Sequence, residues 1–291
     1  MSVYFWALSA NLSYAVGVQF LARYARSISS MWMNCFKALF ACAAFLLWVL
    51  LVEGFHPIDP RAAGAFALSG ALGLGLADAF SLKAFAVMGP GRTLLLYGFQ
   101  PLLLGVLGPA WLGQEADPRR WTAIGFFIAC LAVFSVESWK RSGRWEPRAL
   151  LYALSGLCLD TCGLIITRLS FDHSPGITTM EGNLYRGLGA VLFMGVVSRI
   201  RPFDFRGRWR SLRLRDRLWV SLGSFLATFL ALAFYLQAVR QGHLATISAI
   251  GITGVMLAAG LECGLERRAP SKYLVAAFAL FLGGMAVLLR G

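Results

Sequence analysis

The sequence predicts an all-α membrane protein with ten transmembrane helices arranged as two inverted five-helix repeats. Three observations support this prediction. The 291-residue chain is 58% hydrophobic and only 14% charged, with a mean hydropathy of +0.67, whereas soluble domains carry about a quarter charged residues. Most of the chain divides into apolar runs whose length is close to the roughly 20 residues that a bilayer-spanning helix needs. The two halves of the chain also resemble each other.

Composition excludes several other classes. There is too little polar surface for a soluble body of this size. The net charge of +13 does not indicate nucleic-acid binding, because the basic residues lie between apolar runs as cytoplasmic anchors do. The six cysteines lie within or at the ends of apolar runs without metal-ligand spacing, so no metal or cofactor is expected. GxSxG, HExxH and Walker motifs are absent, which argues against an enzyme and against an ATP-driven pump.

The ten expected spans follow from the breaks between apolar runs. They cover residues 3–21, 30–52, 62–86, 93–113, 119–137, 148–169, 178–198, 217–238, 243–264 and 270–289. The first run lacks a preceding positive segment, so it is expected to be a retained span and not a signal peptide. The longest polar insert is residues 199–217, and no stretch is long enough for a domain outside the membrane.

An internal repeat relates the second span to the seventh. Residues 29–41 align without gaps with residues 178–190, and Asn34 and Lys37 correspond to Asn183 and Arg186. The chain therefore divides into two halves, residues 1–140 and 147–291. Because each half holds an odd number of spans, the second half enters the membrane from the opposite side. Inverted repeats of this kind let a transporter open alternately to its two sides.

Ionisable groups inside membrane spans are costly, so each is a candidate functional residue. Lys37 and Arg186 are expected to face a central cavity and to hold a carboxylate or phosphate, or alternatively to snorkel to the interface. Asp78 and Asp160 are candidates for cation binding or proton coupling. Alternatively, the two aspartates neutralise Lys37, Lys83 or Arg186 in fixed pairs.

Four uncharged polar residues complete the candidate site. Asn11 and Tyr14 share one face of the first span, and Tyr97 and Gln100 share one face of the fourth. Pro101 frees a backbone carbonyl that could bind a ligand or water. The alternative for each residue is an ordinary interhelical hydrogen bond, which contributes about 0.6 kcal/mol.

Several residues also form a family pattern. They are Lys37 and Arg186 early in the second helix of each half, Phe234-Tyr235 followed by Ala238, Gln100-Pro101, Leu112-Gly113-Gln114-Glu115, Trp121 and Gly125. Together they resemble the ten-helix EamA-like exporters of the drug/metabolite transporter superfamily. The departures are Gln100 where the family has Glu, Gln114 between Gly and Glu, and Ile252 where a Pro would fall. The resemblance implies a secondary transporter that exports a small polar metabolite across a bacterial cytoplasmic (inner) membrane.

Two other functions remain open at this point. A flippase for a lipid-linked or phosphate-bearing lipid would use the same basic residues to bind phosphate. A non-transporting membrane partner, such as an assembly subunit, is the other alternative, and the internal repeat argues against it because such a protein would not need one. Eight arginines, from Arg199 to Arg217, alternate with aromatic and leucine residues. They predict either a segment that binds anionic membrane lipids or a plain topology anchor.

The orientation of the chain is predicted in two conflicting ways. Lys and Arg concentrate in the odd-numbered connections, which the positive-inside rule places in the cytoplasm, with both termini outside. The family resemblance implies both termini inside. Glu181, at the start of the seventh span, is expected to lie at the membrane interface.

Overall fold

The computed structural model describes residues 3–100, 103–104, 147–241, 244–265, 267 and 269–289, and scattered positions between 122 and 140. Every regular element among these residues is a helix. In chain order the helices are α1 (Val3–Ser27), α2 (Ser30–Trp48), η1 (Val49–Glu53), α3 (Pro60–Gly70), η2 (Ala71–Ala77), α4 (Asp78–Met88), α5 (Pro90–Tyr97), α8 (Pro147–His173), α9 (Thr179–Ile200), α10 (Phe205–Ser211), α11 (Leu214–Ser224), η3 (Phe225–Leu230), α12 (Ala231–Gln241), α13 (Leu244–Leu265) and α14 (Lys272–Leu289). The elements η1, η2 and η3 are π-helical turns that continue longer helices.

Four continuous helical stretches are long and apolar enough to cross a membrane. They are Ser30–Glu53, Pro60–Met88, Pro147–His173 and Leu214–Gln241, and they coincide with the second, third, sixth and eighth expected spans. The prediction of an integral, multi-pass, all-helical membrane protein is therefore confirmed. Helices α1, α9, α13 and α14 occupy the ranges of four more expected spans, whereas the count of ten and the inverted repeat stay predictions. The fourth span beyond residue 104, most of the fifth span, Pro101, Gln114, Glu115 and Trp121 lie outside the described residues.

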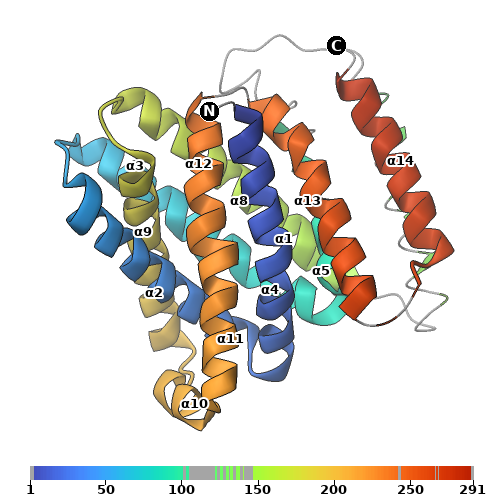
Figure 1. Ribbon diagram of the computed structural model, residues 1–291, viewed down its shortest axis with the longest axis horizontal. Helices are drawn as coiled ribbons and strands as arrows, with labels where there is room; N and C mark the ends of the chain where they lie inside the picture. Colours follow the sequence, from blue (N-terminus) through green and yellow to red (C-terminus); the bar gives the residue numbers. More distant parts are fainter. Residues whose placement is uncertain are drawn as a thin grey trace.

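The helices form a bundle in which α1 begins at the same end as α14 finishes (Figure 1). This is called the upper end here, and the opposite end, where α10 lies, is called the lower end. Helix α1 packs against α12 and α13, and α9 packs against α2 and α3. The first helix of the chain thus lies against helices of the second half, and the two halves are interleaved.

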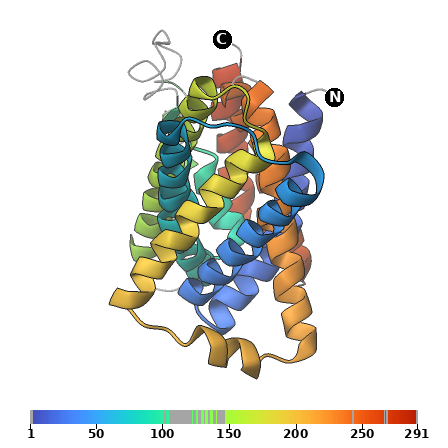
Figure 2. The ribbon, with the colours of Figure 1, turned by 90° about the vertical axis from the view of Figure 1, so that its left-hand side faces the viewer.

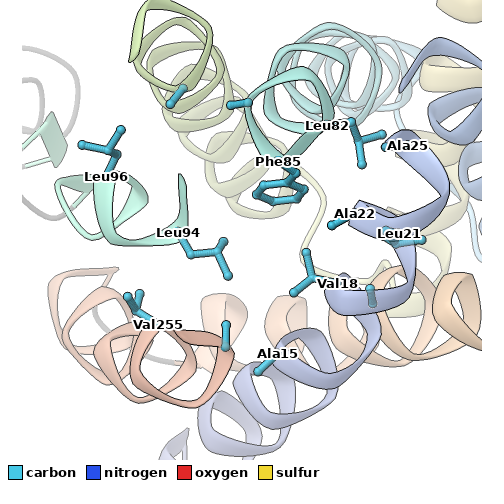
Figure 3. Close-up of a cluster of buried hydrophobic side chains, with 14 of the residues drawn as sticks. Ala15, Val18, Leu21, Ala22, Ala25, Leu82, Phe85, Leu94, Leu96 and Val255 are labelled. Carbon is cyan, nitrogen blue, oxygen red and sulfur yellow. The ribbon is translucent and has the colours of Figure 1, made fainter. Parts of the chain in front are cut away.

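Small and branched apolar residues pack together toward the lower end. Val18, Ala22, Leu82, Phe85 and Leu94 belong to one buried cluster contributed by α1, α4 and α5 (Figure 3). Lipid tails are as apolar as these side chains, so close van der Waals contact, and not exclusion of water, holds such helices together. The alanines of α1 permit that close contact.

Glycine allows the closest approach, between α3 and α9. A Cβ atom added at Gly189 would lie 1.8 Å from the backbone oxygen of Ala67, whereas one added at Gly195, on the same helix, would meet nothing within 4 Å. We expect Gly189→Ala to destabilise the protein by about 1–3 kcal/mol, because the backbones must move apart. Gly195→Ala is the matched control and should leave the unfolding temperature in detergent unchanged. Equal unfolding temperatures for the two variants would contradict this contact.

Candidate functional site

A cavity of about 200 Å³ lies inside the bundle, with walls formed by α1, α2, η2, α4, α5, α8, α9, η3, α12 and α13. All eight polar residues selected from the sequence line it: Asn11, Tyr14, Lys37, Asp78, Tyr97, Gln100, Asp160 and Arg186. They come from six separate helices and the turn after α5. Their convergence on one cavity is a property of the fold, and their roles in binding or coupling remain a prediction.

The two basic residues reach the cavity by the same local arrangement. Asn34 on α2 donates from Nδ2 to the Gly75 oxygen in η2 at 2.7 Å, and Asn183 on α9 donates from Nδ2 to the Leu232 oxygen just beyond η3 at 3.0 Å. Both asparagines are fully buried. Lys37 and Arg186 follow one helical turn later, on the same face as the asparagines. A π-helical turn frees backbone carbonyls of the partner helix, and such turns often occur at functional sites.

Lys37 forms an ion pair with Asp78 inside the cavity wall. Lys37 Nζ contacts Asp78 Oδ2, and the two side chains are 7% and 23% exposed. Asp78 begins α4 directly after the π-helical turn η2. The alternative Asp78–Lys83 pair is not formed, because Lys83 Nζ instead lies 5.3 Å from the ring centroid of Tyr152. Lys37 is therefore largely neutralised and is not a free anion receptor in this conformation.

Asp160 lies in the middle of α8 and is held by the turn after α5. Its Oδ2 accepts a hydrogen bond from Gln100 Nε2 at 2.8 Å, and the nearby Tyr97 hydroxyl is hydrogen-bonded to Ser81 Oγ. Asp160 and Arg186 both lie next to Gly73, since a Cβ added there would be in ordinary contact with Asp160 Oδ1 at 3.4 Å and with Arg186 Nη2 at 3.6 Å. Asp160 and Arg186 therefore face each other across Gly73 without forming an ion pair.

Arg186 is the most unusual group in the cavity. The residue is only 3% exposed, yet its Nε and Nη1 atoms are buried without a hydrogen-bond partner. Burying a charged donor without a partner is among the most costly arrangements in a protein, especially in a membrane. A guanidinium can donate two parallel hydrogen bonds to a carboxylate or phosphate, through Nη2 together with either Nε or Nη1. Arg186 is therefore a candidate group for binding an anionic ligand.

The cavity can bind and orient a ligand. Lys37 and Asp78 compensate each other, which leaves Arg186 and Asp160 as the two groups of opposite charge facing the space. Within the described residues, no three His, Cys, Asp or Glu side chains are grouped closely enough to hold a metal ion.

Two lining residues from the eighth expected span escaped selection. Tyr235 and Thr228 both face the cavity, and Thr228 Oγ1 is buried without a hydrogen-bond partner. Tyr235 carried a signal, because it belongs to the Phe-Tyr step of the family pattern. Nothing in the sequence pointed to Thr228, since a single threonine in an apolar run is common in membrane helices. Its position at a π-helical turn gives it access to the cavity.

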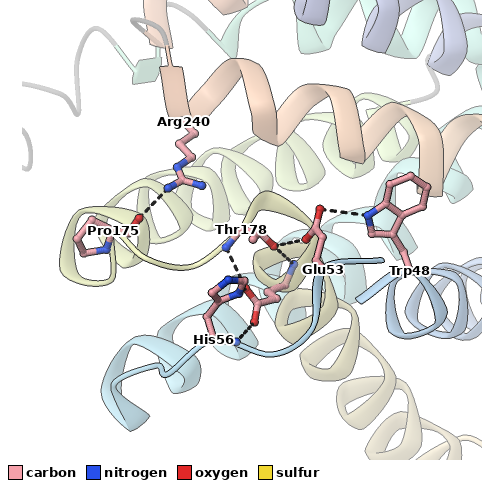
Figure 4. A network of polar contacts seen from close by, with 7 residues as sticks. Trp48, Glu53, His56, Pro175, Thr178 and Arg240 are labelled. Carbon is pink, nitrogen blue, oxygen red and sulfur yellow. Dashed lines mark hydrogen bonds and ion pairs between the residues drawn. The ribbon is translucent and has the colours of Figure 1, made fainter. Parts of the chain in front are cut away.

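The position of Glu181 at the membrane interface stays a prediction. The residue lies in the first turn of α9, at the upper end of the bundle, and its side chain is fully buried. It accepts hydrogen bonds from the His56 backbone N at 2.7 Å and the Thr178 backbone N at 3.0 Å. Thr178 Oγ1 in turn donates to Glu53 Oε2 at 2.6 Å, and Trp48 Nε1 donates to Glu53 Oε1 (Figure 4). The network ties the α2–α3 connection to the start of α9 at the upper end. The His56 amide lies 125 residues away in the sequence, whereas Thr178 and Glu181 form a local capping box at the start of α9.

We expect Glu181→Ala to destabilise the protein by about 2–5 kcal/mol, since it removes a buried carboxylate that accepts hydrogen bonds from two backbone amides, and hydrogen bonds to a charged group contribute about 1.5–3 kcal/mol each. Asp172→Ala is the control, because Asp172 is 54% exposed and takes part only in an i,i+4 ion pair with Arg168. Exposed pairs of this type contribute less than about 1 kcal/mol. Thermal unfolding in detergent compares the two variants, and similar losses in both would argue against the buried network.

The comparisons with known proteins agree with this architecture. A solved structure titled "Crystal structure of protein" aligns with 99% of this chain and 95% of its own, at 16% identity and a TM-score of 0.68. Identity this low shows a shared fold and nothing about function. No curated protein matches the sequence. The family model of the EamA-like transporters matches residues 1–136, a little under half of the chain, and this similarity is consistent with the drug/metabolite transporter superfamily.

Proposed function

We propose that the protein is a secondary transporter that exports a small polar metabolite bearing a carboxylate, with the cavity around Arg186 as its substrate site. The similarity of residues 1–136 to the EamA-like transporter family supports transport across a membrane as the function. The observation that carries the finer proposal is the buried guanidinium with two unpartnered donors, in a cavity lined by ten polar side chains.

The size and charge of the cavity narrow the substrate class. Its 200 Å³ is below the roughly 300–1,000 Å³ of pockets for drug-sized ligands. The substrate is therefore small. A carboxylate satisfies Arg186, and a cationic or hydroxyl group elsewhere on the substrate satisfies Asp160. No observation within the described residues supports the flippase alternative.

Alternating access between the halves, residues 1–140 and 147–291, is the proposed mechanism. The Asn34–Lys37 and Asn183–Arg186 arrangements support it, because each half supplies one asparagine anchor, one basic residue and one π-helical turn to a shared cavity. Rocking of one half against the other would then move both walls of the site together.

The packing supports a conformation closed toward the lower end. Below the cavity, α1, α4, α5 and α13 contribute to a large buried apolar cluster. Positive charge concentrates at this end, in the α9–α11 connection, which favours a cytoplasmic location for it and both termini outside. The upper end combines smaller buried apolar clusters with the polar contacts around Glu181.

Asp160 and Asp78 are the proposed proton-coupling residues. Each aspartate faces the cavity beside a basic group. Protonation of its carboxylate would remove the negative charge that attracts Lys37 or Arg186. We expect Asp160→Asn combined with Asp78→Asn to abolish the dependence of transport on a pH gradient. Unchanged gradient dependence in this double variant would rule out coupling through these residues.

The test of the proposed substrate class is ligand-induced thermal stabilisation of the purified protein in detergent. The panel contains amino acids, other small carboxylates, amines, nucleobases, sugar phosphates and polyprenyl-phosphate analogues. A ligand at 100 times its dissociation constant adds about 2.7 kcal/mol to the free energy of unfolding. Stabilisation by small carboxylates supports the proposal, and stabilisation by amines or lipid phosphates alone overturns it.

A further inference from the structure

We propose that the groove between the end of α1 and helix α10 binds the phosphate of an anionic phospholipid headgroup. The groove has a volume of about 350 Å³ and lies at the lower end of the bundle, outside the transport cavity. The proposal is independent of the transported substrate.

Helix α10 lies flat against the bundle because its apolar residues are docked on α2. Trp32 Nε1 donates a hydrogen bond to the Phe205 oxygen at 3.1 Å, and the rings of Phe205 and Trp209 stack against Trp32 and Phe36 at centroid distances of 5.5 and 5.0 Å. Figure 2 shows the connection from α9 to α11 running along the lower end. A short helix with one docked aromatic face presents its other face outward, at the level where headgroups lie.

The outward face is strongly basic. Of the eight arginines from Arg199 to Arg217, only Arg217 is used by the fold: its Nε donates to the Trp209 oxygen at 3.1 Å and its Nη2 to the Arg210 oxygen at 2.9 Å. The other seven are exposed, and none forms an ion pair with a carboxylate in the described part of the chain. This surface therefore carries excess positive charge that the protein does not balance itself.

The groove brings one of these arginines together with a second arginine from α1 and with hydroxyl groups. Arg23 and Ser27 line it from α1, and Arg208 and Ser211 line it from α10. Asp216 also lines the groove, but it accepts a hydrogen bond from Tyr24 at 2.9 Å, and two cations outweigh one anion. The Ser211 hydroxyl already donates to the Arg208 oxygen at 2.8 Å, so the two guanidinium groups and the Ser27 hydroxyl are the donors that match a phosphate group. The location at the membrane surface makes a lipid headgroup the occupant.

The test compares lipid binding in two double variants. Arg23→Gln with Arg208→Gln removes the groove charges, and Arg61→Gln with Arg148→Gln removes two exposed charges elsewhere. Full-length protein in detergent is titrated with phosphatidylglycerol, phosphatidylcholine or inorganic phosphate while thermal unfolding is followed, and native mass spectrometry counts bound lipid. Each basic residue near an anionic surface contributes about a fivefold factor in affinity. We therefore expect the groove variant to lose roughly 25-fold in affinity for phosphatidylglycerol, and the control to lose less.

Three outcomes decide the proposal. Selective loss of phosphatidylglycerol binding in the groove variant supports it. Equal losses in both double variants would show diffuse surface charge instead of a site and would overturn it. Equal stabilisation by inorganic phosphate and by phosphatidylglycerol would overturn the lipid assignment, because a free phosphate would then be the occupant.

Discussion

Arg186→Gln is expected to lower substrate affinity at least 100-fold, because charge-assisted hydrogen bonds to a ligand are worth about 1.5–3 kcal/mol each and two are lost. The same change should leave the unliganded protein about as stable as before. Arg186 Nε and Nη1 make no hydrogen bond in the folded protein, so removal of the guanidinium breaks none of these contacts. Ligand-induced thermal stabilisation and unliganded unfolding temperature, measured on the same preparation, check both parts.

Two further variants sharpen this prediction. Arg186→Lys keeps the positive charge but loses the planar guanidinium with its paired donors, so we expect an intermediate affinity for the substrate. Arg199→Gln makes the same substitution on the same helix at an exposed position, and it should bind substrate like the unmodified protein. Normal substrate affinity in Arg186→Gln would remove this residue from the site.

Neutralising one member of the Lys37–Asp78 pair is expected to cost about 3–5 kcal/mol of folding stability, because the other charge is left uncompensated in a largely buried position. Lys37→Met and Asp78→Asn should each show this loss. The double variant should recover most of it, since two well-packed neutral residues can replace a buried pair at little cost. Thermal unfolding of all four proteins gives the coupling energy by a double-mutant cycle.

Transport measurements show whether the Lys37–Asp78 pair takes part in transport or only stabilises the fold. The recovered stability of the Lys37→Met, Asp78→Asn protein should not be accompanied by recovered transport, because the groups that respond to substrate or proton are gone. Additive losses of stability in the double variant would contradict the ion pair. Full transport by the double variant would make the pair purely structural.

The candidate site could be selected from the sequence because the chain is predicted to lie in a lipid bilayer, where polar side chains are rare. Charged and amide groups are expensive in a bilayer, so Lys37, Asp78, Asp160, Arg186 and Gln100 were conspicuous within apolar runs. Their meeting in one cavity follows from helix packing, because polar faces of membrane helices turn toward one another and away from lipid. The long spans could be predicted for the same reason, since a membrane imposes their length.

Pairing and local geometry could not be predicted in the same way. Which acid neutralises Lys37 depends on the π-helical turn η2 before Asp78, and no composition signal marks such a turn. The burial of Glu181 depends partly on the His56 backbone amide, which lies far away in the sequence. The helix α1 continues to Ser27, past the expected end at residue 21. Arg26, in the last turn of α1, donates a hydrogen bond from Nε to the Phe85 oxygen at 3.3 Å. This arginine therefore belongs to the helix and not to the connection that follows it.

Substrate counterflow in proteoliposomes tests the central claim most directly, that the Arg186 cavity is a substrate site open alternately to the two faces. Vesicles are loaded with an unlabelled small carboxylate that stabilises the protein, and uptake of the labelled compound is followed without any ion gradient. Labelled substrate should accumulate with the unmodified protein and with Arg199→Gln, and should fail to accumulate with Arg186→Gln. Equal accumulation by Arg186→Gln, or none by the unmodified protein, would contradict the account.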